Sequence, residues 1–252
     1  MSGLKDKTIL VTGGSRGIGA AIVEAAIREG AHVVLHYGRG KAAADALIAA
    51  SPAGRCLAVP ADLSVRGAAQ ALWQTSVAWQ GRIDVLVNNA GIYIPDGADA
   101  PTEAWDRAWD ETLQVNLRAT ADLCRLAIRD FRPWGGGSIV NIASRAAFRG
   151  DGPDFMAYAA SKGAMIALTR TIARGHASAG ILCYAVAPGW VRTDMAEDFI
   201  RSQGEDAAIR DIPLGAMAPA EEVANIVVFL ASGKARHATG ATFDINGASY
   251  VR

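Results

Sequence analysis

The 252-residue chain lacks several features that mark whole classes of protein. Its three cysteines, Cys56, Cys124 and Cys183, lie far apart without metal-type spacing, so we expect reduced thiols, a cytoplasmic setting and no metal. The 25 basic residues balance 25 acidic ones, which excludes a net field that would attract nucleic acid or an anionic membrane. No apolar run reaches the about 18 residues that a membrane span needs, and no long apolar stretch follows the charges of residues 1–7, so we expect no leader peptide. A small molecule is therefore the expected partner.

Short apolar segments alternate with helical patterns along the whole chain. The apolar segments are Thr8–Val11, His32–His36, Cys56–Val59, Ile83–Val87, Ser138–Ile142, Ile181–Val186 and Thr242–Ile245. This alternation predicts an α/β fold with a doubly wound, parallel, seven-stranded sheet and helices on both faces. The hydrophobic content of 51% can fill one large core, and no repeat or linker divides the chain, so we expect residues 1–252 to form a single domain. The ligand of such a sheet lies beyond the carboxyl ends of its strands.

A glycine-rich turn follows the first apolar segment and precedes a helical pattern from Ala20 to Arg28. It reads Thr12-Gly13-Gly14-Ser15-Arg16-Gly17-Ile18-Gly19. Gly13 can adopt backbone angles closed to other residues, Gly17 lets the chain approach a pyrophosphate, and Gly19 allows the helix to lie close to the strand. The first helical N–H groups and the helix dipole then face the phosphates. Taken alone, the turn is also compatible with an ordinary connection between a strand and a helix.

Tyr158 and Lys162 are four residues apart in a segment rich in helix formers, which places them on one helical face. A nearby positive charge favours the ionised form of a phenol, so we expect Lys162 to ease proton exchange by Tyr158 near neutral pH. Taken alone, the same spacing is also compatible with a surface pair without chemistry. The accompanying motifs decide between these interpretations.

Together, several motifs resemble the short-chain dehydrogenase/reductase family in their order and separation. They are the glycine turn from Thr12 to Gly19, Asn88-Asn89-Ala90-Gly91, Asn116, Ser144, Tyr158-x-x-x-Lys162 and Pro188-Gly189. The resemblance spans nearly the whole chain and implies a Rossmann-type fold that transfers a hydride between a nicotinamide and a carbonyl or alcohol. Within the family, the chain looks most like the bacterial 3-oxoacyl-(acyl-carrier-protein) reductase-like group.

The resemblance implies four catalytic residues, Asn116, Ser144, Tyr158 and Lys162. Carbonyl reduction leaves negative charge on oxygen, so the site needs a hydrogen-bond donor and a proton source there. Ser144 would hold the substrate oxygen and Tyr158 would exchange the proton. By resemblance, Lys162 also binds the nicotinamide ribose and Asn116 helps to hold a water chain. Alone, Ser144 would be interpreted as capping a loop and Asn116 as a helix-kink residue.

The cofactor-binding residues are expected at the ends of the strands. They are Gly13, Ser15, Arg16, Gly17, Ile18, Gly19, Tyr37, Arg39, Asp62, Leu63, Asn89, Ala90, Gly91, Tyr158, Lys162, Pro188, Gly189, Val191 and Thr193. By resemblance, Asp62 bonds the adenine, although helix capping is an alternative role for which Ser64 is better placed. Asn88 is expected to tie adjacent strand ends together.

The end of the second strand predicts which nicotinamide is used. Tyr37 stands where an NAD-binding site would place an acid, and Arg16 and Arg39 can both reach a ribose phosphate. NADP(H) is therefore favoured and NAD(H) remains possible, with solvated surface arginines as the alternative interpretation.

Departures from the family pattern bear on the substrate. The stretch from Arg145 to Ala157 is longer than in the acyl-carrier reductases, and Arg145, Arg149 and Asp151 make the predicted cleft polar. A small polar alcohol or sugar is therefore an alternative substrate. We expect a substrate lid at about residues 190–215. Met195, Phe199 and Ile200 are candidates to face the ligand, although such a stripe is more often ordinary packing onto the body of the protein.

The resemblance also implies a homotetramer, formed through the helices around Asn116 and Tyr158 and through Thr242–Ile245. Two other classes of function stay open: a catalytically silent NADP(H)-binding regulator, and a structural subunit that the cofactor only stabilises.

Overall fold

A computed structural model describes residues 3–193, 196–197, 200–201 and 204–252. Its strands are β1 (Thr8–Val11), β2 (His32–Tyr37), β3 (Cys56–Pro60), β4 (Val85–Asn88), β5 (Gly137–Ile142), β6 (Ile181–Pro188) and β7 (Thr242–Ile245). They form one parallel sheet of seven strands in the order β3-β2-β1-β4-β5-β6-β7. The order reverses direction between β1 and β4, which is the crossover expected of a doubly wound sheet. The predicted Rossmann-type fold is confirmed.

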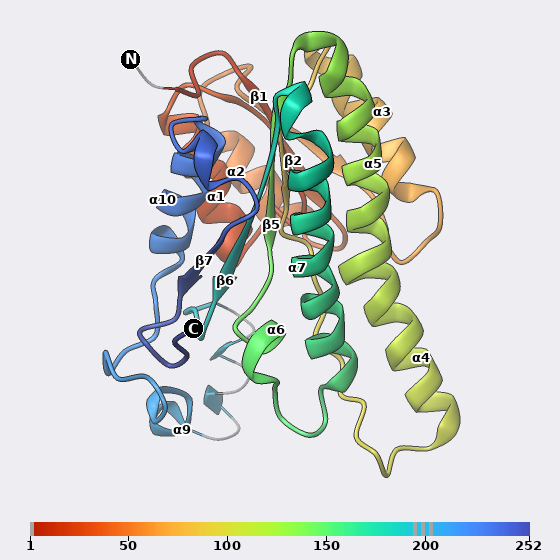
Figure 1. Cartoon of the computed structure of the whole chain (residues 1–252), viewed down its shortest axis with the longest axis vertical. Helices are drawn as coiled ribbons and strands as arrows, with labels where there is room; N and C mark the ends of the chain where they lie inside the picture. Colours follow the sequence, from red (N-terminus) through yellow and green to blue (C-terminus); the bar gives the residue numbers. More distant parts are fainter. Residues whose placement is uncertain (1–2, 194–195, 198–199, 202–203) are drawn as a thin grey trace.

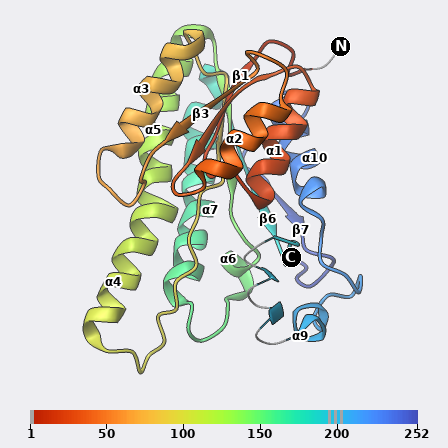
Figure 2. The same ribbon diagram turned by 180° about the vertical axis from the view of Figure 1, so that it is seen from behind.

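Helices cover both faces of the sheet (Figures 1 and 2). One face carries α1 (Gly17–Arg28), α2 (Lys41–Ala50) and α10 (Ala220–Ala231), and the other carries α3 (Ala68–Gln80), α5 (Ala119–Phe131) and α7 (Met156–His176). Side chains alternate across a strand, so Ile9 and Val11 of β1 join the core beneath α1 and α10, while Leu10 joins the core beneath α3 and α5. Both faces of β1 are therefore buried.

Several predicted boundaries differ from the structure, most by one residue and three of them with a consequence for the fold or the site. β4 begins at Val85 rather than Ile83. The residue just before it, Asp84, accepts a hydrogen bond from the backbone N–H of Thr8 through Oδ2 at 2.9 Å. β6 continues to Pro188 because that residue still pairs with Ile245 of β7. Helix α1 begins at Gly17, three residues before the expected Ala20, so the last glycines of the turn are already helical.

The remaining helices frame the carboxyl edge of the sheet. α4 (Thr102–Leu113) runs through a π-helical segment, Gln114–Arg118, directly into α5, and Asn116 lies in that π-helical segment. α6 (Ala146–Arg149) and α9 (Glu205–Ile209) lie toward the lower end of the view in Figure 1, close to where β5 and β6 end. Among the helices that the structure describes, none combines the length and apolar character of a membrane span.

Candidate active site

The glycine-rich turn takes backbone angles that a side chain would oppose. Gly13 and Gly17 have φ of 62° and 53°, in the left-handed region that favours glycine. A Cβ atom at Gly19 would lie 2.0 Å from the carbonyl oxygen of Gly13, which no side chain allows. The turn therefore folds tightly onto the start of α1, and the first N–H groups of this helix face the carboxyl edge of the sheet.

Side chains from the neighbouring strands hold the turn in place. The Thr12 hydroxyl accepts the N–H groups of Asn89 and Ala90 at 2.9 and 3.0 Å, and Asn89 Nδ2 donates to the carbonyls of Thr12 and Gly13. The amide of the predicted cofactor residue Asn89 thus supports the turn itself. As expected, Asn88 ties strand ends together, donating to Asn141 Oδ1 at 2.8 Å.

His36, which the sequence did not single out, also fastens the glycine turn. Its Nδ1 accepts the N–H of Gly13 at 3.0 Å, and its Nε2 lies 3.0 Å from the carbonyl oxygen of Ala61. These two partners require the neutral ring with its proton on Nε2. Burial lowers the pKa of His36, which favours the same neutral form.

The end of β2 brings the predicted phosphate-binding residues to the turn. A Cβ atom at Gly40 would lie 2.7 Å from Ser15 Oγ, so the loop that carries Arg39 lies against the glycine turn that carries Arg16. Arg16 and Arg39 are exposed, whereas Tyr37 is buried at the end of β2. Ile18 packs partly against the core.

Asp62 and Leu63 follow β3 and have different environments. Asp62 is exposed, and its Oδ1 accepts both the N–H and the hydroxyl of Ser64. Those hydrogen bonds lower the pKa of Asp62, and the charge of Arg39 lowers it further. Leu63 is buried, and its carbonyl accepts Gln114 Nε2 at 3.2 Å. Ser64 does not cap α3, which begins at Ala68 after Gly67, so that expectation was wrong.

The segment after β4 meets the predicted catalytic helix. A Cβ atom at Gly91 would lie 3.5 Å from both Asn116 Oδ1 and Lys162 Nζ, so these three residues lie next to one another. Asn116 is fully buried, and its amide accepts the N–H of Ile92 at 2.8 Å and donates to the Ile92 carbonyl and to Ser161 Oγ. Asn116 therefore joins the loop after β4 to α7.

Ser144 and Tyr158 form the second half of the site. Ser144 follows β5, and its hydroxyl accepts the N–H of Ala146 at 3.1 Å at the start of α6. Burial raises the pKa of Tyr158 to about 12, although the nearby Ser144 hydroxyl acts on that pKa in the opposite direction. The phenol thus stays protonated at neutral pH.

Lys162 is buried beneath Tyr158 on α7. Its Nζ donates to the carbonyl of Ile142 at 2.8 Å and lies 5.6 Å from the centre of the Tyr158 ring. Burial lowers the pKa of this ammonium to about 8. A small rise above neutral pH therefore removes its proton.

Aromatic rings form a wall beside Tyr158. Tyr93 stacks on Phe155 with ring centres 3.7 Å apart and meets the Tyr158 ring edge-on at 4.8 Å. Asp151 is near enough to Tyr93 and Tyr158 for its charge to raise the pKa of both tyrosines. Asp151 and Tyr93 are therefore part of the site, and only the polarity of Asp151 was anticipated from the sequence.

A buried carboxylate caps the start of the catalytic helix. Asp96, fully buried in the loop after β4, accepts the N–H groups of Met156 and Ala157 at 2.8 and 2.6 Å. These N–H groups belong to the first turn of α7, where a negative charge is also favoured by the helix dipole. No local sequence pattern could reveal this cap because it comes from 60 residues earlier in the chain.

The loop after β6 closes the remaining side of the glycine turn. A Cβ atom at Gly17 would lie 3.0 Å from the methyl group of Thr193, and Gly189 donates its N–H to the carbonyl of Ile245 at 2.9 Å. Pro188 accepts the N–H of Arg145, and Val191 is buried. Within the predicted lid, Met195 and Phe199 lie outside the described residues, and Ile200 packs on a small cluster formed by Ala196, Ala208, Ile212 and Met217.

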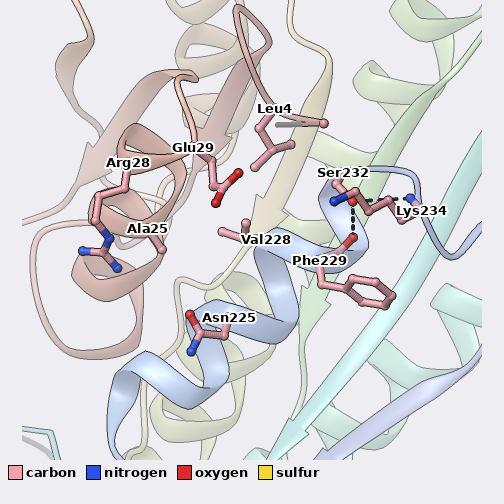
Figure 3. Close-up of a pocket in the computed structure, with 10 residues that line it drawn as sticks. Leu4, Ala25, Arg28, Glu29, Asn225, Val228, Phe229, Ser232 and Lys234 are labelled. Carbon is pink, nitrogen blue, oxygen red and sulfur yellow. Dashed lines mark hydrogen bonds between the residues drawn. The ribbon is translucent and has the colours of Figure 1, made fainter. Parts of the chain in front are cut away.

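A separate hollow lies away from these residues (Figure 3). This pocket of about 260 Å³ lies where α1 ends and β1 begins, between Leu4, Arg28 and Glu29 on one side and Asn225 and Phe229 of α10 on the other. It contains none of the predicted site residues and faces the amino ends of the strands. The carboxyl edge, where the titratable groups converge, is the better candidate site on chemical grounds.

The carboxyl edge has the shape that a dinucleotide requires. The positive φ values of Gly13 and Gly17 leave backbone exposed where side chains would otherwise stand, and Thr193, Gly91 and Lys162 surround the same edge. The N-terminus of α1 suits a pyrophosphate, and the buried ammonium of Lys162 suits a hydroxyl-rich ribose. The residues present therefore fit a nicotinamide dinucleotide.

Comparisons with known proteins agree with this geometry. Residues 13–248 match the family described as Enoyl-(Acyl carrier protein) reductase. A 3-oxoacyl-[acyl-carrier-protein] reductase of Staphylococcus aureus is 33% identical over 97% of this chain and 98% of its own. A 3beta-hydroxysteroid dehydrogenase of Eggerthella lenta is 36% identical over 97% and 94%, and an oxidoreductase of Methylorubrum extorquens is 36% identical over 98% and 99%. The chain therefore belongs to the short-chain dehydrogenase/reductase family and is an NAD(P)-dependent oxidoreductase acting on a carbonyl or alcohol group.

Proposed function

We propose that this oxidoreductase reduces a carbonyl group held between Ser144 and Tyr158. The observation that carries the proposal is the position of Tyr158: its ring centre lies 5.6 Å from Nζ of the buried Lys162, and the Ser144 hydroxyl is near enough to act on the pKa of its phenol. A bound nicotinamide would supply the hydride. Ser144 donates a hydrogen bond to the substrate oxygen, and Tyr158 delivers the proton as negative charge develops there. The high pKa of Tyr158 supports reduction at neutral pH because the protonated phenol is the form that this direction needs.

The other residues have binding and positioning roles in this proposal. Lys162 holds the ribose hydroxyls, and Asn116 fixes the loop after β4 against α7. The dinucleotide is cradled by the glycine turn, by Asp62 and Leu63, by Asn89, Ala90 and Gly91, and by the segment from Pro188 to Thr193. Its pyrophosphate lies on the N-terminus of α1.

NADP(H) is the proposed cofactor. The support is the approach of the Arg39 loop to the turn that carries Arg16, together with Tyr37 rather than an acid at the end of β2. Two guanidinium groups suit a ribose phosphate, whereas an acid at that position would repel it.

The substrate is proposed to be a 3-oxoacyl compound or a smaller polar carbonyl compound. The name of the Staphylococcus relative supports the first, and the charged groups near Ser144 favour the second. We also propose that one domain binds both ligands and that residues 190–215 cover the substrate.

A homotetramer is proposed as the assembly. β7 is an edge strand, and the side chain of Phe229 on the neighbouring α10 is 44% exposed. A light-scattering mass of four chains supports this assembly, and a mass of one chain contradicts it.

The test of the function is loss of nicotinamide absorbance with NADPH and, separately, NADH across 3-oxoacyl thioesters, diketones, aldehydes and keto sugars. We expect turnover of at least one carbonyl, and faster turnover with NADPH. If neither cofactor is consumed, and alcohols with NADP⁺ or NAD⁺ are silent as well, the proposed function is wrong.

A further inference from the structure

Arg145 is a largely buried cation that directly follows Ser144 in the chain. Its backbone N–H donates to the carbonyl of Pro188 at 2.9 Å. Only 12% of its side chain is exposed, and its Nη1 forms an ion pair with Asp211 Oδ2 at 3.3 Å. Apart from this ion pair, that buried nitrogen makes no hydrogen bond within the described part of the chain. A buried guanidinium with unused donors is costly unless a ligand engages it.

A second guanidinium shares the same carboxylate. Arg149, at the end of α6, places Nη1 2.5 Å from Asp211 Oδ2 and 3.5 Å from the carbonyl oxygen of Ser249. One carboxylate oxygen therefore serves two arginines, each of which has five N–H donors. Asp211 is 40% exposed, so this side of the cluster is open to solvent.

The arginine pair belongs to the surroundings of Tyr158. Arg149 lies on α6, which packs against α7, the helix that carries Tyr158. The charge of Asp151 also acts on the pKa of both Arg145 and Tyr158. The peptide after Arg145 adds a direct connection, because the N–H of Ala146 donates to Ser144 Oγ. A substrate whose carbonyl lies at Ser144 therefore extends next to the start of α6.

We propose that Arg145 and Arg149 bind a carboxylate of the substrate, so that this enzyme acts on an oxo acid or the corresponding hydroxy acid. Planar guanidinium groups bind carboxylates through paired hydrogen bonds, and the pair already holds one carboxylate, that of Asp211. This inference rests on the proposed function for the position of the carbonyl. It deepens that function by selecting free acids over neutral esters and carrier-bound thioesters.

Asp211 has a competing role in this proposal. It partly neutralises the arginine pair and offers it the same functional group as the substrate. Asp211→Asn removes this competing charge, so the KM for an oxo acid should fall while the KM for its methyl ester changes much less.

The test uses three oxo acids, 3-oxobutanoate, 4-oxopentanoate and 5-oxohexanoate, and the methyl ester of each. Two quantities are measured for each compound with wild-type protein and with Arg149→Gln. The first is kcat/KM with NADPH and with NADH, and the second is the affinity of the protein for the compound, by calorimetry. We expect kcat/KM and affinity for at least one acid to exceed those for its ester by about tenfold or more. Arg149→Gln should remove most of this difference. Arg55→Gln is the matched control, because Arg55 is 32% exposed against 38% for Arg149 and also pairs with an aspartate, Asp6.

The readouts separate this inference from the proposed function. If each acid and its ester are turned over or bound equally at all three chain lengths, the proposed carboxylate site is wrong, but the proposed reductase activity is not affected. Absence of turnover on every carbonyl and alcohol contradicts the reductase, and the calorimetric ratio of acid to ester still decides the carboxylate site. An acid preference that Arg149→Gln leaves unchanged also overturns it, since the preference then arises elsewhere.

Discussion

Tyr158 and Lys162 have opposite pKa shifts from one cause. Burial raises the pKa of the phenol to about 12 and lowers that of the ammonium to about 8, because a charged form is disfavoured in both. The phenol is therefore a proton donor at neutral pH, while the lysine proton is easily exchanged. The four-residue spacing predicted that they would share a helix face, but only the fold shows that Lys162 is buried and Tyr158 half-buried.

Among single residues, Tyr37 is the one that we propose sets the cofactor preference. Tyr37→Asp places a carboxylate at the end of β2, where it would attract ribose hydroxyls and repel a ribose phosphate. We expect the ratio of kcat/KM for NADPH to that for NADH to fall by about tenfold or more. Tyr37→Phe is the control that keeps the ring, and an unchanged ratio in Tyr37→Asp would reject the proposed phosphate site.

Helix α7, which carries the proposed catalytic Tyr158 and Lys162, is capped by a residue from outside the helix. Met156 and Ala157 donate their N–H groups to Asp96 in the loop after β4, and Tyr158 follows immediately. The periodic pattern of the chain was sufficient to predict β1 and β7 with their observed bounds. It could not predict the start of α3, because Asp62 engages Ser64 in a local turn and so removes the expected cap.

Asp96→Ala should loosen the first turn of α7. Loss of a charged helix cap costs about 1–2 kcal/mol of unfolding free energy, which urea denaturation measures. We expect kcat to fall as well, since Tyr158 is on that turn. Asp96→Asn should lose less unfolding free energy and less kcat than Asp96→Ala because one acceptor oxygen remains. The exposed Asp99 in the same loop gives the control Asp99→Ala. Equal stability in Asp96→Ala and wild type would show that the cap contributes nothing.

Segments that are distant in the sequence come into contact at the carboxyl edge of the sheet. His36 from β2, Asn89 after β4 and Thr193 after β6 all lie at the glycine turn. The fold class and the family motifs could be predicted from local pattern and spacing. His36 and Asp96 could not, because their partners are 23 and 60 residues away and are set only by the strand order.

The neutral ring of His36 makes the stability of the whole fold depend on pH. Its pKa in the folded chain is lower than the ordinary 6.5 because of burial, so protons bind the unfolded chain more readily. The stabilisation is full above about pH 6.5 and is lost as pH falls through the lowered pKa. We expect the unfolding free energy of wild type to fall more steeply from about pH 7 to about pH 5 than that of His36→Gln. Parallel slopes would contradict this role, and exposed His237→Gln is the control.

The most direct test of the catalytic account is Tyr158→Phe, assayed for turnover and for NADPH affinity in one preparation. The variant keeps the aromatic ring beside Tyr93 and removes only the phenolic hydroxyl. We predict that turnover falls by at least about a hundredfold while the Kd for NADPH stays within about twofold. Full activity in Tyr158→Phe would contradict the proton donor assigned here.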